Sequence, residues 1–233
     1  MGFILGLDLG QANDWTALTV IEQTEIAGAP ENALFRYDIR HCDRVRRVPF
    51  DKIAERVRDL VERLAESVVL VVDKTGLGAP VNNILEMVGV QAQIVPVTIT
   101  GGNEAVRHGA EWTVPKRDLA TTVAVCLQTG RLHIGREVPH AETLMREMQN
   151  FRVRISVSGH DTYEAWRSAD HDDLVLSVAL AVWYCEHGQG SQGFVRYLEA
   201  EIADRRRGGG VVPKPVPPPP APEPEKPPRA FYI

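Results

Sequence analysis

Apolar residues recur along this chain with two different periods, and together they predict a sheet with helices packed against it. Short runs of Val, Ile and Leu bounded by turn residues predict buried strands, whereas apolar positions spaced by three and four predict amphipathic helices. The expected strands cover residues 3–9, 16–21, 34–40, 68–72, 93–99 and 152–157. The expected helices cover residues 51–66, 80–88, 116–129, 141–150 and 172–185.

The order of these elements predicts an α/β fold. The first three strands follow one another directly, which favours an antiparallel meander, and later strands are reached through helices. The run 68–72 is apolar at every position, as is typical of a strand that is covered on both faces. We therefore expect a mixed central sheet flanked by helices on both faces, with the nearly all-apolar segment 172–185 packed deeply.

The character of the chain changes after residue 190. We expect a single domain over residues 1–190, a peripheral helix over 191–207 and a disordered Pro-rich tail over 208–233. Ten of the chain's 16 prolines lie between Pro213 and Pro228. A segment of this composition buries too little apolar surface to fold and favours an extended conformation.

Composition narrows the function classes only slightly. The formal net charge of −5 gives no overall sign of nucleic-acid binding, so contact with DNA would need a local basic patch or metal ions. Cys42, Cys126 and Cys185 are widely spaced and predict reduced thiols in a cytoplasmic protein rather than a zinc site. No window approaches 18 apolar residues, so we expect no signal peptide and no membrane span.

Three separated acidic sites lie at the edges of elements that should be buried. Asp8 ends the first strand, Asp73 follows the run 68–72, and the pair Asp172-Asp173 opens the last helix. A buried carboxylate is costly unless it is compensated, and a divalent cation is a common compensation. Taken singly, each acid could equally be a turn residue or a helix N-cap; taken together, they favour a metal site.

These sites belong to a series of short motifs whose order resembles a known family. The chain is similar to the nuclease domain of large terminase subunits, the DNA-packaging motors of tailed phages, within the ribonuclease H-like superfamily. The resemblance covers roughly residues 3–187. It is carried by Gly6-Leu7-Asp8-Leu9-Gly10, Asn13-Asp14-Trp15-Thr16-Ala17, Val72-Asp73-Lys74-Thr75-Gly76-Leu77-Gly78-Ala79-Pro80, Pro115-Lys116-Arg117-Asp118-Leu119, Gly130-Arg131-Leu132 and His171-Asp172-Asp173-Leu174-Val175.

The resemblance implies a ribonuclease H-like fold and a metal-dependent endonuclease. Asp8 and Asp73 would each bind metal, and one or both of Asp172 and Asp173 would complete the site, with Asp173 the first choice. The implied cofactor is two Mg²⁺ or Mn²⁺ ions, which cleave phosphodiesters when held about 3.5–4 Å apart. His171 would assist as a metal ligand or proton shuttle. An ordinary residue before a helix is an equally good interpretation of His171.

Other matched residues receive supporting roles. Asp14 and Thr75 would contact the metal ligands without binding metal themselves, although Asp14 is better explained as an acidic residue of a turn. Lys116 and Arg117 would contact DNA phosphates, or else form a solvated helix start. Arg152 and Arg154 alternate with apolar residues and would lie on one face of a hairpin that follows the DNA backbone, or on the solvent side of a strand.

The implied partner is double-stranded DNA. The sequence contains no GxxxxGK[ST] phosphate loop, so genome packaging would need a separate packaging ATPase, with a portal protein as a further partner. A phage or prophage protein of this kind would act in the host cytoplasm.

Three other functions compete with this one. A Holliday-junction resolvase would share Asp8 and the late acid pair. An actin-like or sugar-kinase-like ATP-binding fold would use Asp8-Leu9-Gly10 as a phosphate-binding turn, but the sequence shows no second turn of that type. A non-catalytic interaction module would keep the fold and bind partners through the tail. This function would not explain why all of the acidic residues Asp8, Asp73, Asp172 and Asp173 are present.

Overall fold

The computed structural model describes residues 2–10, 14–28, 35–64, 67–75, 80–154 and 172–188. All of these residues belong to one compact unit, Met1–Gly190. The predicted peripheral helix and Pro-rich tail lie outside the described residues.

Five α-helices and eight strands make up the described part of the compact unit. The strands are β1 (Gly2–Asp8), β2 (Trp15–Glu25), β3 (Phe35–Arg46), β4 (Val68–Asp73), β5 (Gln93–Thr100), β6 (Val106–His108), β7 (Glu111–Pro115) and β8 (Leu132–Ile134). The helices are α1 (Phe50–Leu64), α2 (Pro80–Val88), α3 (Lys116–Gln128), α4 (Ala141–Arg154) and α5 (Asp173–Trp183), which continues as the π-helical turn η3 (Tyr184–Gly188).

All eight strands belong to one mixed sheet in the order β6-β7-β5-β4-β1-β2-β3-β8. β1, β2 and β3 form an antiparallel meander, while β4 and β5 run parallel to β1. The predicted mixed sheet is confirmed. The meander followed by parallel strands also agrees with the order of elements predicted from the sequence.

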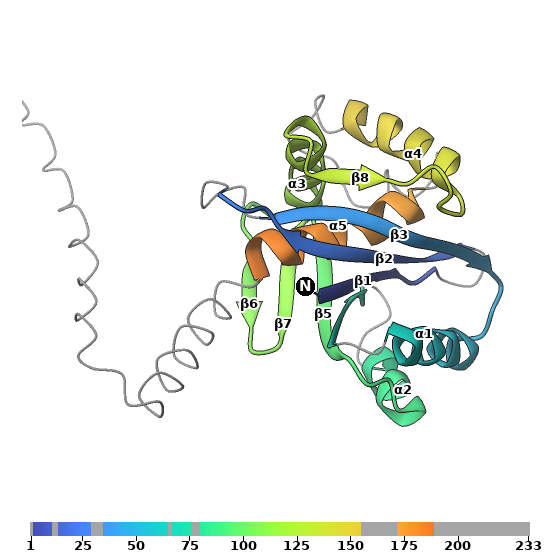
Figure 1. The fold of residues 1–233 in the computed structure, drawn as a ribbon. Helices are drawn as coiled ribbons and strands as arrows, with labels where there is room; N and C mark the ends of the chain where they lie inside the picture. Colours follow the sequence, from blue (N-terminus) through green and yellow to red (C-terminus); the bar gives the residue numbers. More distant parts are fainter. Residues whose placement is uncertain are drawn as a thin grey trace, which may run out of the picture. The chain divides into compact units, whose positions relative to one another are not determined.

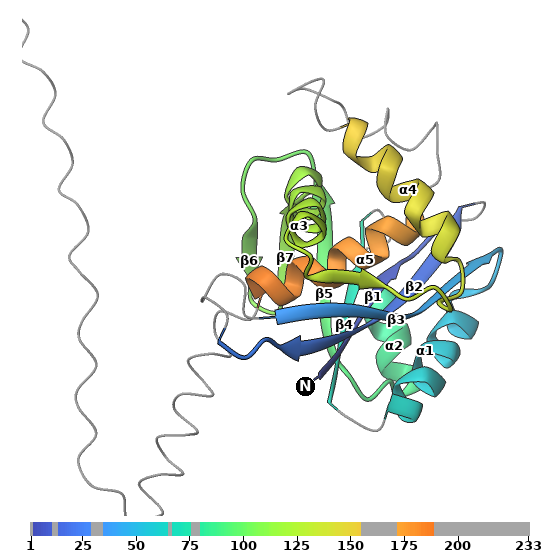
Figure 2. The ribbon, with the colours of Figure 1, turned by 45° about the horizontal axis from the view of Figure 1, so that its top comes forward.

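Helices cover both faces of the sheet, as predicted (Figure 1). The alternation of side chains in β1 assigns each face: Leu5 and Leu7 pack with α1 and α2, whereas Ile4 packs with α5. Figure 2 shows α5 lying over the sheet, with α3 and α4 farther out. α1 packs through its apolar face and exposes charged residues on the other, where Lys52 pairs with Glu55.

Several elements differ from the sequence prediction. The hairpin β6–β7 and the three-residue β8 were not predicted, because strands this short carry too few positions to show a period. The predicted strand 152–157 is wrong at its start: Arg152 and Arg154 lie in α4, and 155–157 lie outside the described residues. The helical spacing of the buried residues Leu144, Met148 and Phe151 carries α4 through the segment.

α5 lies very close to β1 at Gly6. A Cβ atom added to Gly6 would lie 1.8 Å from the carbonyl oxygen of Ser177, which is backbone and cannot swing away. Glycine at this position therefore lets α5 rest directly on β1. Because Asp8 follows two residues later in β1 and Asp173 lies one helical turn before Ser177, this contact also sets the distance between those two acids.

A chain of buried hydrogen bonds reinforces the contact between α5 and β1. The Ser177 hydroxyl donates to the Leu174 carbonyl at 2.8 Å, so Thr19, which pairs with Gly6 across β1 and β2, must donate to Ser177 Oγ at 2.6 Å. Cys42 Sγ lies 3.7 Å from Thr19 Oγ1. Because the Thr19 hydroxyl already donates to Ser177, the Cys42 thiol is the donor in this contact. Each hydroxyl inside this interface is thus satisfied.

We expect Gly6→Ala to destabilise the protein strongly, because its methyl group would overlap the Ser177 carbonyl. The free energy of unfolding should fall by about 3 kcal/mol, an overpacking cost at the upper end of the usual range. For a domain of this size, the melting temperature should drop by about 6–12 °C.

Gly2→Ala is the matched control, since a Cβ there meets nothing within 4 Å in the same strand. Urea or thermal unfolding of both variants measures the effect. Equal stability of the two variants would show that α5 does not need Gly6.

Candidate active site

Two strand ends bring Asp8 and Asp73 together. β1 and β4 are parallel neighbours, and both acids lie one residue beyond the Leu7–Val72 pair of their register. Both side chains belong to the face that α5 covers, because Ile4 and Val71, which alternate with them, pack in that core. The predicted positions of Asp8 and Asp73, each at the end of a strand, agree with this geometry.

The start of α5 brings the late acid pair to the same place. Asp172 is the N-cap residue, whose side chain makes no capping hydrogen bond within the described residues, and Asp173 is the first residue of the helix. Both carboxylates raise the pKa of Asp8 through charge repulsion. Asp8, Asp73, Asp172 and Asp173 therefore form one carboxylate cluster, named here the acidic cluster.

Asp8 is the member of the cluster whose charged form is disfavoured most strongly. Only 8% of it is exposed, and burial, followed by repulsion from Asp73, Asp173 and Asp172, raises its pKa well above the ordinary range; Lys116 offsets part of this. No described side chain donates a hydrogen bond to its carboxylate. An ionised carboxylate here requires a nearby positive charge.

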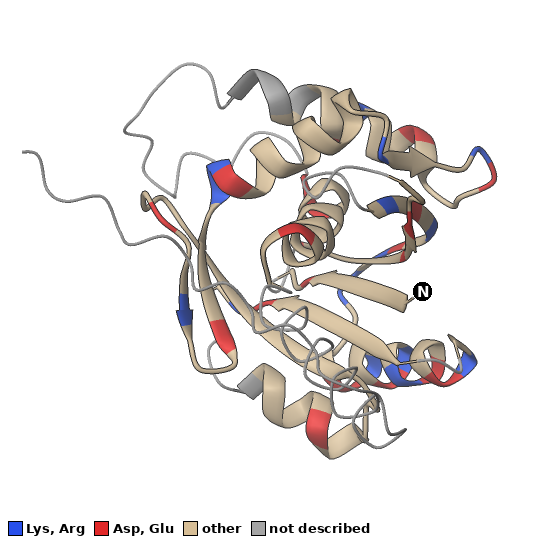
Figure 3. Ribbon diagram, turned by 60° about the vertical axis from the view of Figure 1, so that its left-hand side comes forward, with Lys and Arg blue, Asp and Glu red and all other residues tan. Residues whose placement is uncertain are grey.

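Two cations already approach the cluster in this arrangement. Lys116 Nζ lies 2.6 Å from Asp172 Oδ2, and Arg44 Nη2 lies 2.9 Å from Asp173 Oδ2. Figure 3 shows the start of α3, where Lys116 lies, as adjacent cationic and anionic residues. Among the described residues, no three acid, His or Cys side chains converge closely enough to hold one ion.

The chemistry of the cluster nevertheless fits a divalent cation. All four donors are carboxylates, the oxygen ligands that Mg²⁺ and Mn²⁺ prefer. Asp8 also carries an electrostatic demand that a cation would meet. A bound cation would compete with Lys116 for Asp172 and with Arg44 for Asp173.

Thr75 orients Asp73. Both the backbone N–H (2.7 Å) and the hydroxyl of Thr75 donate to Asp73 Oδ1, and Thr75 Oγ1 accepts the N–H of Ile99 at 2.8 Å. One carboxylate oxygen of Asp73 is thereby fixed to the backbone of β5. The supporting role predicted for Thr75 agrees with these contacts.

Glu147 and Arg44 belong to the site but were not predicted from the sequence. Glu147 Oε2 accepts the N–H of Val175, at the start of α5, at 3.1 Å, and its Oε1 lies 3.3 Å from Arg44. Arg44 thus bridges Glu147 and Asp173, with only 11% of its side chain exposed. The sequence holds one signal for Glu147: a carboxylate beside Met148 on the apolar stripe of α4.

The other predicted residues lie apart from the cluster or beyond the described residues. Asp14 is exposed and does not contribute to the pKa of Asp8. Arg117 is exposed and donates to Asn103 from α3. His171 lies outside the described residues. The side chains of Arg152 and Arg154 are likewise not described, and their helical backbone removes the hairpin predicted for them.

Buried thiols play no part in the cluster. All three cysteines are free and buried, as predicted, and burial raises the pKa of Cys42 and of Cys126 to about 11. Among the described helices, none is long and apolar enough to cross a membrane.

The stability of the metal-free protein should depend on pH through Glu147. Burial raises the pKa of Glu147 from 4.5 to about 7, because Val175 and Arg44 offset only part of the cost. The folded state thus binds more protons than the unfolded state between about pH 4.5 and 7. The free energy of unfolding should therefore fall as pH rises through this window, by a few kcal/mol in order of magnitude.

Glu147→Gln keeps an acceptor for the Val175 N–H and removes the titration. In EDTA, urea unfolding from pH 5 to 7.5 should show wild type losing stability relative to this variant as pH rises. Glu142→Gln, at an exposed position of the same helix, should run parallel to wild type. A pH-independent difference between wild type and Glu147→Gln would contradict the expected pKa.

Comparison with known proteins supports the resemblance found in the sequence. No protein-family model matches the chain. Two curated relatives do match, the large terminase subunits of Thermus phage G20c and Thermus virus P23-45, each 24% identical over 204 residues and 88% of this chain. The chain spans about a third (34%) of the length of these relatives.

Similar solved structures include the large terminase nuclease of phage G20c, which is 18% identical with a TM-score of 0.48 and covers 79% of this chain and 82% of that chain. A RuvC structure from Thermus thermophilus is 13% identical with a TM-score of 0.40 over 80% of this chain and 95% of that chain. The resemblance of this chain to large terminase subunits, first seen in its motifs, is confirmed by the sequence relatives.

Proposed function

We propose that this chain is a metal-dependent DNA endonuclease that, like the terminase nuclease, cuts concatemeric phage DNA during genome packaging. The observation that carries the proposal is the acidic cluster, in which Asp8 is buried against three other carboxylates. This arrangement is costly for Asp8 in a metal-free protein, because Lys116 offsets only part of the burial and the repulsion. The similarity to large terminase subunits supports DNA as the substrate.

In this proposal Asp8 and Asp73 hold two Mg²⁺ or Mn²⁺ ions together with Asp173, and Asp172 is the alternate ligand. The ions supply an activated water and stabilise the leaving oxygen. Asp8 would be the central ligand of this site, because burial and the repulsion from three other carboxylates favour a positive charge beside it.

The surrounding residues hold these ligands in place. Thr75 fixes one carboxylate oxygen of Asp73, Oδ1, through its backbone N–H and its hydroxyl. Glu147 accepts a hydrogen bond from the first turn of α5, and Arg44 pairs with Asp173. A bound ion would take the place of Arg44 beside Asp173. Lys116, once released from Asp172, stands at the start of α3 where it can contact a phosphate.

The partners of the chain follow from the same proposal. Under this proposal the nuclease would work with a packaging ATPase and a portal protein in the host cytoplasm. As the isolated site is not ordered by a partner, we expect weak activity that Mn²⁺ stimulates.

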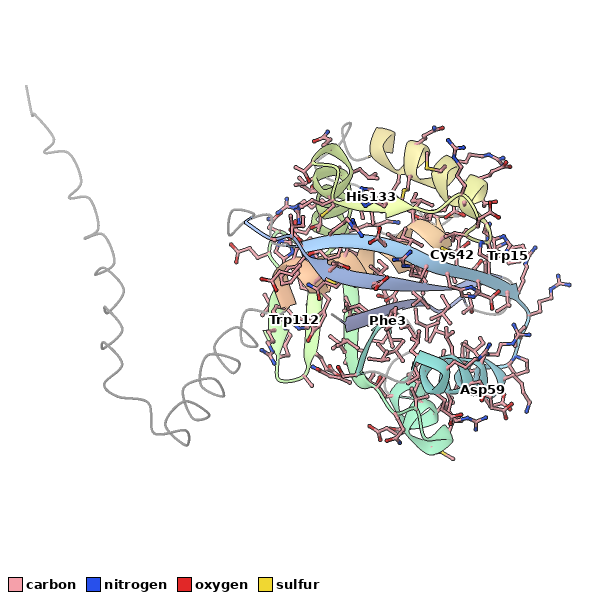
Figure 4. The ribbon with its side chains drawn as sticks, in the orientation of Figure 1. Phe3, Trp15, Cys42, Asp59, Trp112 and His133 are labelled. Carbon is pink, nitrogen blue, oxygen red and sulfur yellow. The ribbon has the colours of Figure 1, made fainter. Side chains whose placement is uncertain are left out.

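Cleavage of supercoiled plasmid in Mg²⁺, Mn²⁺ and EDTA tests the proposal. Asp8→Asn and Asp73→Asn should each lower metal-dependent nicking by about 100-fold or more, since losing a metal ligand removes several kcal/mol of transition-state stabilisation. Asp59→Asn, on α1 over the opposite face of the sheet (Figure 4), is the control and should cut like wild type.

Unfolding adds a signature that nonspecific damage would not produce. In EDTA at pH 7.5, Asp8→Asn should be more stable than wild type, because it removes a buried, repelled charge. In Mn²⁺ wild type should gain melting temperature, and Asp8→Asn should not. Wild-type protein with neither cleavage nor a metal-induced shift would refute the nuclease.

A further inference from the structure

A second group of residues lies at the same edge of the sheet as the acidic cluster. Because the meander is antiparallel, the end of β1, the start of β2 and the end of β3 coincide there. The register pairs Asp8 with Ala17 and Ala17 with Arg44. The next pair on the same side, two residues farther out, is Trp15 with Arg46.

Trp15 and Arg46 also share the face of the cluster. On β2, Trp15 alternates with Ala17 and Thr19, which pack and hydrogen-bond on the α5 side. On β3, Arg46 alternates with Arg44, which reaches Asp173. Figure 4 shows Trp15 at the end of the sheet opposite Phe3 and Trp112.

The indole of Trp15 organises two guanidinium groups. The Arg44 Cζ atom lies 4.5 Å from the ring centroid and the Arg46 Cζ atom 5.7 Å from it, both within cation–π range. The charge of Arg44 is matched by Glu147 and Asp173 inside the protein. Arg46 is exposed, as is the next residue, Arg47.

We infer that Trp15 and Arg46 form a contact surface for the sugar–phosphate backbone of the DNA strand that enters the acidic cluster. The inference rests on the proposed nuclease function and adds the residues that hold its substrate. Trp15 would fix the Arg46 guanidinium, and Arg46 would bind a phosphate through paired N–H groups.

The spacing suits this role. With strands about 4.8 Å apart and a rise of about 3.4 Å per residue, the Arg46 backbone lies about 12 Å from that of Asp8. One DNA strand carries a phosphate per ~3.4 Å of helix axis, so Arg46 would meet a phosphate about three positions from the scissile one. A positive contact at that distance offsets the repulsion between DNA and an acidic chain.

Measuring DNA affinity against salt concentration for the full chain in Ca²⁺, with a fluorescent 30-base-pair duplex as probe, tests the inference. Removing one phosphate contact should lower the slope of log affinity against log salt by about 0.9. Arg46→Gln should show this loss and bind several-fold more weakly at low salt. Arg46→Lys should keep most of the slope, and Trp15→Ala should weaken binding as Arg46→Gln does.

Arg40→Gln is the matched control. Arg40 lies in the same strand, is 54% exposed and pairs with Glu22 at 2.6 Å, but lies six residues from Arg46. Its removal changes the net charge equally and should leave the slope unchanged. Equal effects of Arg46→Gln and Arg40→Gln would overturn the inference, because only net charge would then matter.

Plasmid cleavage by the same variants separates this inference from the proposed function. If wild type cleaves and Arg46→Gln binds and cleaves like Arg40→Gln, the nuclease stands and the Trp15–Arg46 surface is refuted. If wild type binds but does not cleave, the slopes still decide whether Arg46 contacts phosphate. Wild type that does not bind DNA would overturn both.

Discussion

The contact between Gly6 and the backbone of Ser177 is the constraint on which the rest of this structure depends. It allows α5 to lie directly on the central strand, so that one helix fills the core and presents its first residues to the strand ends. A side chain at position 6 would move the helix outward by a displacement that the acidic cluster could not absorb, because Asp8 and Asp173 flank the contact. Packing and chemistry are therefore set by the same few atoms.

The electrostatics of the cluster depend on burial more than on the number of acids. Asp8 is costly because water is excluded from it, whereas Asp172 and Asp173 have Lys116 and Arg44 beside them. The same logic applies to Glu147, which is held by Val175 and Arg44 but remains in an apolar setting. Cations contributed by β3 and α3 act as internal counter-ions for acids contributed by α5.

The sequence was sufficient where a local pattern determines the outcome. Uniform apolar runs located β1, β4 and α5, and the ends of those runs located Asp8, Asp73 and Asp173. It was insufficient where a role arises from tertiary contacts: Arg44 lies in a part of β3 beyond the predicted strand, and Glu147 gains its role only when α4 packs near α5. The period of two in 152–157 was misleading because the backbone of α4 stays helical through Arg154.

The position of α5 has a consequence for synthesis of the protein. Asp8 leaves the ribosome early, whereas Asp172 and Asp173 arrive only with the helix that completes the core. A nascent chain that has made the meander lacks both the last ligands and the element that orders them, and these contacts between distant parts of the chain form slowly. Under the proposed function, cutting would begin only after the whole unit has folded, so an unfinished nuclease would be harmless to the DNA around it.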